Sequence, residues 1–352
     1  MYQRNFRVTR QTAKNTDRTV LSCYAAYPDS EPRFIVQFIH GISEKKERYA
    51  YVMEHITKSG GIALIHDLRG HGESAASYDG LGYFGDFGYD YRTLCEDIDI
   101  VLAAMSVPHD PNEENPLITI DTRKEFVFPD LPRYLYGFSM GSLIAGIYAA
   151  KTPETLAGLM LGGLPRHQCL APAALAGLGI LELIFGEQHK SFIMNKLAFT
   201  SYNRKFKPEP EADGRFMWLS NDIENRILFA DDPICAHKKT LNAFTCLVRL
   251  VRDFYRPSSW NMPRRDLPIY IMAGEFDPVL AGDKNALYAR KFLKDIGFHD
   301  VRITMYRGMR HEILRDFGRE QVFYDIISFI ESTMDAENAQ LSEIRAKLAP
   351  VP

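Results

Sequence analysis

The feature that most constrains the chain is the pentapeptide GFSMG at residues 137–141, which has the pattern G-x-S-x-G. Residues 133–136 before it favour a β-strand, and residues 143–150 after it form the apolar run of a buried helix. A serine at a sharp turn between strand and helix needs small neighbours, because the backbone is strained and the side chain must stand clear of it. The motif therefore predicts such a turn, with Ser139 at its apex.

Composition excludes several classes of protein. The chain has 352 residues, 46% hydrophobic and 25% charged, as in an average globular protein. A net charge of −3 gives no basic field for nucleic acid. The first twenty residues lack an apolar signal core, and no run of about eighteen apolar residues occurs. The five scattered cysteines lack paired ligand spacing. We expect a cytoplasmic protein with reduced thiols and without a spanning helix.

Short apolar runs alternate with helical segments along most of the chain. The expected strands are 34–39, 62–65, 133–136, 156–161, 267–272 and 301–306, and the expected helices are 47–59, 91–105, 284–295 and about 317–348. This alternation predicts an α/β fold with a doubly wound, mostly parallel sheet and helices on both faces. Residues 5–9 and 19–27 are expected to form an antiparallel hairpin at one edge.

Two stretches interrupt the alternation. Residues 109–130 are polar and Pro-rich, which indicates a surface excursion before the strand that precedes Ser139. Residues 164–263 no longer show the alternation of strands and helices, and we interpret them as an inserted, mostly helical cap. The core segments are then 1–163 and 264–352. Within the cap, 171–185 is apolar almost all round and 240–255 is helix-like. The apolar stretches 178–185 and 192–199 are expected to pack onto the catalytic domain, and contact with a membrane surface is the alternative.

A serine hydroxyl needs a base, and the base needs an orienting acid. The late histidine that follows an expected strand is His311, because His299 precedes that strand. Asp277 follows the 267–272 strand, so serine, acid and base occur in a recognised order at strand ends. Glu275, two positions earlier, is the competitor for the acid role. An aspartate before proline is also a common turn former.

Stabilising an oxyanion requires backbone N–H groups fixed in advance. One is expected from Met140, after the serine, and a second from Ile42, where Gly41 lets the chain turn. His40 is expected to brace this loop by hydrogen bonds, although it could border the substrate pocket. Phe138 and Cys235 are further pocket candidates, and small residues in helix packing are an equally good interpretation of Cys235.

The sequence HDLRGHGES at residues 66–74 is a dense polar cluster at a strand end. Its histidines lack zinc-ligand spacing, and its glycines indicate a tight loop. We expect an architectural role, with Asp67 and Arg69 holding neighbouring loops. Neither a metal nor a cofactor is predicted.

Together these segments resemble the serine hydrolase branch of the α/β-hydrolase superfamily that contains monoacylglycerol lipases and lysophospholipases. The family's H-G-x-x-E-x-x-x-R-Y matches 40–49, its D-x-x-G-H-G-x-S matches 67–74, and its G-H-S-M-G-G corresponds to GFSMGS at 137–142. A cap segment like D-P-L-I-C is similar to DPIC at 232–235. Two departures, Phe138 for His and Ser142 for Gly, change the packing around the serine without removing a catalytic group.

The resemblance implies that Ser139 is the nucleophile, His311 the base and Asp277 the acid of an α/β-hydrolase. We expect a carboxylic ester hydrolase that works through an acyl-serine intermediate, on a monoacylglycerol or lysophospholipid, with possible membrane contact through the cap. The rivals are a peptidase or amidase, which would need cap carboxylates for an amine, and a non-catalytic binding protein on the same scaffold. Acyl length, head group and oligomeric state are not predicted.

Overall fold

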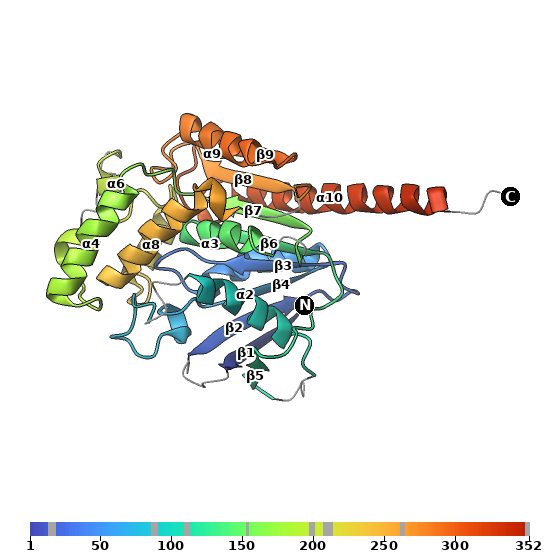
Figure 1. Ribbon diagram of the computed structural model, residues 1–352, viewed down its shortest axis with the longest axis horizontal. Coiled ribbons are helices and arrows are strands. Elements are labelled where there is room, and N and C mark those ends of the chain that lie inside the picture. Colours follow the sequence, from blue (N-terminus) through green and yellow to red (C-terminus); the bar gives the residue numbers. More distant parts are fainter. Residues whose placement is uncertain are drawn as a thin grey trace.

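The computed structural model describes residues 1–12, 19–85, 91–108, 113–152, 155–196, 201–206, 214–260 and 265–348, with side chains as far as 336. A nine-stranded sheet runs through the molecule in the order β5-β1-β2-β4-β3-β6-β7-β8-β9 (Figure 1). The strands are β1 Tyr2–Gln11, β2 Val20–Tyr27, β3 Phe34–Ile39, β4 Gly61–His66, β5 Leu117–Asp121, β6 Arg133–Phe138, β7 Gly158–Gly162, β8 Ile269–Gly274 and β9 Val301–Tyr306.

The sheet is mostly parallel, and β2 is antiparallel to both of its neighbours, β1 and β4. All residues of β3, β4, β6, β7 and β8 are buried, as expected for parallel strands covered on both faces. The expected mostly parallel sheet and the N-terminal antiparallel hairpin are therefore confirmed.

The edge of the sheet differs from the expectation. Part of the 109–130 excursion forms β5, which pairs in parallel with β1, so the hairpin does not lie at the sheet edge. Ile118 and Ile120 of β5 point inward and pack with Phe6 and Val8 of β1. The alternation of apolar and polar residues in LITID, at 117–121, was the available signal for this strand. Residues 109–112 lie outside the described part of the chain.

Helices cover both faces of the sheet. They are α1 Ala50–Lys58, α2 Arg92–Ala104, α3 Met140–Ala149, α4 Ala171–Phe185, α5 Phe192–Asn195, α6 Ser201–Asn203, α7 Ile223–Asp231, α8 Leu241–Phe254, α9 Asp283–Asp295 and α10 Arg319–Leu348, with short 3-10 turns at Lys46–Tyr49, Gly72–Ser74, Pro257–Ser259 and Ile313–Arg315. The buried apolar side chains form a separate cluster on each face of the sheet. Helices α2, α3 and α9 contribute to the cluster on one face, and α1 and α10 to the cluster on the other. The sheet thus forms the middle of three layers.

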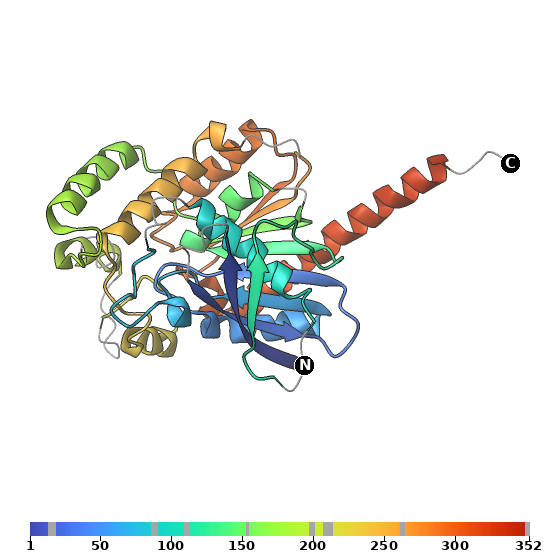
Figure 2. The ribbon, with the colours of Figure 1, turned by 60° about the horizontal axis from the view of Figure 1, so that its bottom comes forward.

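Helices α4 to α8 follow β7 and precede β8, so the helical insertion is where the sequence placed it. They lie at one end of the molecule, whereas the C-terminal half of α10 extends from the opposite end (Figures 1 and 2). Phe254 of α8 packs on α3, where a Cβ at Gly146 would come within 2.3 Å of the Phe254 ring. The domain limits of 164 and 263 remain a prediction, since 261–264 are not described.

Helix α4 packs on α8. Leu178 of α4 clusters with Leu241 and Phe244 of α8, so another helix of the insertion holds its inner face. Its outer face is open: the side chain of Leu183 is 87% exposed, and Ile184 is 64% exposed. All five cysteines are free thiols. Among the described helices, none combines the length and the apolar character needed to cross a bilayer.

Candidate active site

Ser139 lies at the turn between β6 and α3, with φ 53° and ψ −118°. This is a left-handed conformation that a residue with a side chain adopts only under strain. The flanking glycines make the turn sterically feasible: a Cβ at Gly137 would lie 2.2 Å from the carbonyl oxygen of Gly141, and a Cβ at Gly141 would lie 2.1 Å from that of Ile39. The G-x-S-x-G spacing is therefore a packing requirement of this turn.

The structure brings the three predicted catalytic side chains together. The Nε2 of His311 lies 3.0 Å from the Oγ of Ser139, and its Nδ1 lies 2.9 Å from Oδ2 of Asp277. Residues 139 and 311 are 172 positions apart in the chain. His311 and Asp277 are almost completely buried, so water does not compete for these contacts.

Asp277 and Glu275 are separated clearly by their hydrogen bonds. The other carboxylate oxygen of Asp277 accepts from the amide of Val279 at 2.7 Å, which fixes the carboxylate toward the histidine. Glu275 is exposed and accepts instead from the amide of Gly308 at 2.9 Å. The geometry therefore gives the contact with His311 to Asp277 and not to its competitor.

Two aromatic rings hold the imidazole of His311. The Phe138 ring lies 4.8 Å and the Trp218 ring 5.2 Å from the imidazole, measured between ring centroids. Gly163 leaves space for this arrangement, because a Cβ there would come within 3.0 Å of the imidazole and 2.9 Å of Phe138. Phe138 thus lines the site, as predicted, whereas Trp218 was missed because it lies in the cap, far away in sequence.

The loop after β3 approaches the serine from the other side. A Cβ at Gly41 would lie 3.2 Å from the Cβ of Ser139, which is tighter than an ordinary van der Waals contact, so glycine favours this close approach. The amide of Gly41 donates to Glu44 at 2.7 Å, and Ser43 has φ 73°, which turns the loop sharply at Ile42. The other expected donor, the Met140 amide, is the first of α3, where the helix dipole favours negative charge.

His40 braces this loop and does not border a pocket. Its Nε2 accepts from the amide of Leu68 at 2.9 Å, so its Nδ1 carries the proton and donates to the carbonyl of Gly41 at 2.8 Å. Burial lowers the pKa of His40 to about 4, which keeps the ring neutral. Cys235 is likewise buried, in a cluster with Trp218, Leu219 and Phe229. Neither side chain lines the cavities at Ser139 described below, so the structure does not support the pocket roles suggested for His40 and Cys235.

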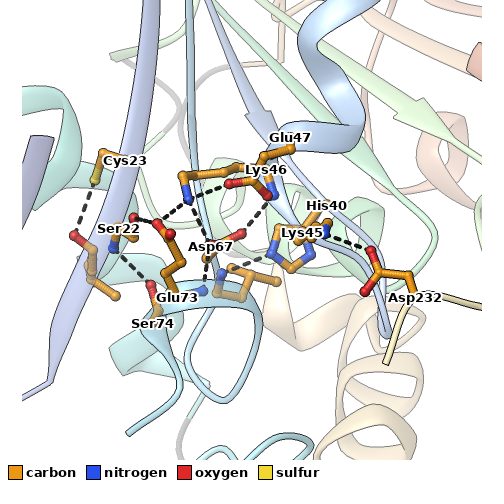
Figure 3. A network of polar contacts seen from close by, with 12 residues as sticks. Ser22, Cys23, His40, Lys45, Lys46, Glu47, Asp67, Glu73, Ser74 and Asp232 are labelled. Atoms are coloured by element: carbon orange, nitrogen blue, oxygen red, sulfur yellow. Dashed lines mark hydrogen bonds and ion pairs between the residues drawn. The ribbon is translucent and has the colours of Figure 1, made fainter. Parts of the chain in front are cut away.

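The polar cluster after β4 is architectural (Figure 3). Asp67 accepts from the amides of Lys46 at 2.7 Å and Glu73 at 2.9 Å, and Arg69 binds Asp97 through two hydrogen bonds of 2.6 and 2.8 Å. Among the described residues, the carboxylates of Glu47, Asp67 and Glu73 come close enough to hold a cation. The ammonium of Lys46 contacts all three, at 2.6, 3.2 and 2.6 Å, and so takes the position of such an ion.

Two cavities meet at Ser139. The α4 cavity, of about 270 Å³, is bordered by residues of α4 and α8 and has a mostly apolar lining: Ile42, Ser139, Pro165, Gln168, Leu170, Ala171, Ala174, Tyr202, Trp218, Leu247, Val248, Val251 and Val279. The α5 cavity, of about 340 Å³, shares Ile42, Ser139 and Trp218 with it. It reaches α5 and the 236–239 segment, and its lining includes both aromatic and charged side chains.

Two carboxylates line the α5 cavity, and both are paired. Glu312 binds the guanidinium of Arg48 through two contacts of 2.9 Å, and Glu44 lies 3.5 Å from the same guanidinium. Burial raises the pKa of Glu44, helped by the nearby Glu312. Burial also opposes ionisation of Glu312, but Arg48 and Arg315, together with the hydrogen bond from Asn225, outweigh it and lower the pKa of that carboxyl. This group had only an indirect signal in the sequence, since Glu44 and Arg48 belong to the motif at 40–49.

Comparison with known proteins agrees with this geometry. The profile of the family described as "Serine aminopeptidase, S33" matches residues 30–317. The chain belongs to this α/β-hydrolase family. A monoacylglycerol lipase of Mycolicibacterium smegmatis is 25% identical over 314 residues, which cover 87% of this chain and 90% of the lipase.

Solved structures with the same fold include a thermostable carboxyl esterase from Bacillus coagulans, with a TM-score of 0.75, 24% identity and coverage of 95% of this chain and 99% of the esterase. A monoglyceride lipase variant from Saccharomyces cerevisiae has a TM-score of 0.64, 17% identity and coverage of 91% and 94%. The hydrolase family is thus established by the profile match, whereas these distant structures show the fold alone.

Proposed function

We propose that the protein is a serine ester hydrolase that forms an acyl-serine intermediate. The observation that carries the proposal is the chain of contacts Ser139–His311–Asp277, at 3.0 and 2.9 Å. His311 takes the hydroxyl proton as Ser139 attacks the ester carbonyl, then protonates the departing alcohol and later activates water. Asp277 fixes the tautomer of the imidazole and stabilises the imidazolium.

The amides of Ile42 and Met140 are the proposed oxyanion donors. Ile42 lines both cavities beside Ser139, and Met140 directly follows Ser139 in the chain. Each such donor is worth about 3 kcal/mol of barrier in enzymes of this type.

The two cavities suggest how an ester is oriented. The α4 cavity suits an acyl chain, because Ser139, Gln168 and Tyr202 are the polar residues among its thirteen lining residues. The α5 cavity then receives the alcohol portion. This division supports a lipid monoester, such as a monoacylglycerol or lysophospholipid, as the substrate. The names of the related lipases point in the same direction.

The peptidase alternative is less well supported, although the family is named for an aminopeptidase. A free amino terminus needs an available carboxylate near the serine. Glu182 accepts instead from Thr245 at 2.7 Å, and Glu187 from Tyr83 at 2.5 Å. Neither lines a cavity at Ser139, and Glu44 and Glu312 are paired with Arg48. Glu209 and Glu211 lie outside the described residues.

Peripheral membrane contact through the cap is part of the proposal. Large apolar side chains are exposed on the outer face of α4 and on the adjacent α5: Ile180, Leu183, Ile184, Phe185, Phe192 and Ile193. Such a surface beside the α4 cavity would bring the entrance for a lipid close to a bilayer.

A fluorophosphonate probe tests the function. Wild-type protein should be labelled and should hydrolyse p-nitrophenyl octanoate and monooleoylglycerol, whereas Ser139→Ala should do neither. Equal labelling of both proteins would reject Ser139 as nucleophile, and no labelling of either would favour a non-catalytic binding protein. Faster cleavage of aminoacyl amides than of esters would favour the peptidase.

A further inference from the structure

One end of the α5 cavity is cationic. Three lysines line it, Lys196, Lys238 and Lys239, and they come from two segments. The ammonium groups of Lys196 and Lys238 lie 6.0 and 5.4 Å from the centroid of the same ring, that of Phe192. Two cations at the cavity mouth therefore flank one aromatic side chain that also lines the cavity.

The two segments are fixed to each other by a single amide side chain. The Oδ1 of Asn195 accepts from the amide of Lys239 at 2.8 Å, and its Nδ2 donates to the carbonyl of Lys239 at 2.9 Å. Asn195 ends α5, directly before Lys196. The reciprocal bonds place Lys196 and Lys239 on the same wall, so the cationic end is a built feature and not a chance gathering of surface lysines.

Lys239 is the inner member of the group. Its side chain lines the cavity although only 5% of the residue is exposed, and its ammonium donates to the carbonyl of His237 at 2.6 Å. Burial lowers the pKa of Lys239 to about 7, and the positive charge of Lys190 acts in the same direction. Burying an ammonium is costly, and an anionic ligand beside it would offset that cost.

The carboxylates of the cavity do not pair with Lys196 or Lys238 in the described part of the chain. Glu44 and Glu312 lie in the Arg48 group described above. In the described part of the chain, Lys196 and Lys238 have no carboxylate within ion-pair distance. Lys45, on the neighbouring loop, is by contrast paired with Asp232 at 2.6 Å.

We propose that the α5 cavity binds an anionic head group, and specifically a phosphate, carried by the alcohol portion of the ester. This rests on the proposed function, since the cleaved ester defines which portion enters which cavity. The α4 cavity is apolar and takes the acyl chain, so the charged group must lie toward α5. A phosphate head group offers several acceptor oxygens and up to two negative charges. It therefore suits three ammonium donors better than a head group with a single carboxylate would.

The test compares two substrates that differ only in the phosphate, 1-oleoylglycerol and 1-oleoylglycerol 3-phosphate, both below their aggregation concentrations. The measured quantity is the ratio of kcat/KM for the phosphate ester to that for the neutral ester. Lys239→Met should lower the ratio about tenfold, which is the effect of one lost charge-assisted contact of about 1.4 kcal/mol. Lys239→Arg keeps the charge and should restore most of the ratio.

The double variant Lys196→Met/Lys238→Met removes only exposed side chains and so keeps the test valid if Lys239→Met does not fold. It should also lower the ratio. Lys294→Met, an exposed lysine of α9, removes the same charge far from the cavity and should leave the ratio as in wild type.

The outcomes separate the two proposals. Labelled Ser139 and hydrolysis of the neutral ester, with no phosphate ester cleaved or with equal ratios in all variants, would overturn the phosphate site and leave the hydrolase intact. Absence of labelling and of all ester hydrolysis would instead remove the proposed function itself. A fall in the ratio that Lys294→Met reproduces would show a general effect of net charge and would also overturn the site.

Discussion

The amide of Glu312 donates a 2.7 Å hydrogen bond to the carbonyl oxygen of Leu219. One residue lies next to the proposed catalytic base, and the other belongs to the cap insertion. The amide of His311 itself points at the carbonyl of Trp218, at 3.4 Å. The position of the imidazole is therefore tied to the cap as well as to the sheet, and several consequences can be measured.

Arg310→Met should lower kcat strongly, and this effect should be larger than a loss of folding stability alone would explain. The guanidinium of Arg310 donates to the carbonyls of Met217 at 2.6 Å and Ser220 at 3.0 Å, which holds the histidine loop against the cap. Without it, His311 is less well oriented, and we expect kcat to fall between about tenfold and a hundredfold. The rate of fluorophosphonate labelling should fall with kcat. Unchanged kcat together with a lower Tm would show that the contact serves stability alone.

Asp277→Asn should retain the fold and lose activity, with kcat lower by about three to four orders of magnitude, because the amide cannot favour the required tautomer or stabilise the imidazolium. Circular dichroism and ester hydrolysis provide the two measurements. Glu275→Gln is the matched control and should stay within a few-fold of wild type, since its carboxylate binds Gly308. The opposite pattern of activities would assign the acid to Glu275.

Gly141→Ala should destabilise the protein, because the new Cβ would lie 2.1 Å from the carbonyl oxygen of Ile39 and 2.6 Å from that of His40. We expect a loss of about 2–3 kcal/mol in the free energy of unfolding, measured by urea denaturation. Gly177→Ala in α4 is the control: its Cβ meets nothing within 4 Å, so stability should rise by about 0.5–1 kcal/mol. A harmless Gly141→Ala would contradict the tight turn.

Acid should destabilise the protein through its buried histidines. Burial lowers the pKa of His66 to about 3 and that of His40 to about 4, whereas the unfolded chain titrates near 6.5. Both therefore contribute stability above pH 6.5 that is lost as the pH falls toward the folded pKa. At pH 5 each costs about 2 kcal/mol by proton linkage. His66→Leu should flatten the dependence of the unfolding free energy on pH between 6.5 and 5; parallel curves for both proteins would contradict this.

Leu183→Ser/Ile184→Ser should weaken association with lipid vesicles. Both side chains are largely exposed on α4, and their transfer into the bilayer interface is the proposed driving force. Loss of two such side chains should reduce the partition coefficient at least about tenfold in a flotation assay. Leu287→Ser, at an exposed leucine of α9 away from the cap, should bind as wild type does. Equal binding of both variants would place the contact elsewhere.

Much of this architecture is encoded in short segments of sequence. The runs that became β3 and β9 have the predicted limits, and the turn at Ser139 follows from two glycines that alone avoid a clash. The order of Ser139, Asp277 and His311 could also be predicted, because parallel strands end at one edge of the sheet and carry their following loops to the same place. Periodicity and steric exclusion act locally, so a single sequence is enough to reveal them.

Other features depended on contacts between distant segments. Trp218 against His311, Asn195 between Lys196 and Lys239, and the pairing of β5 with β1 join residues whose separation along the chain carries no periodic signal. The same holds for His40 and Cys235, whose buried side chains do not line the cavities at Ser139. The sequence by itself determined the parallel core of the sheet, the turn and the set of reactive groups. Tertiary packing of the cap decided which side chains surround Ser139, because that depends on the relative position of helices and not on any one of them.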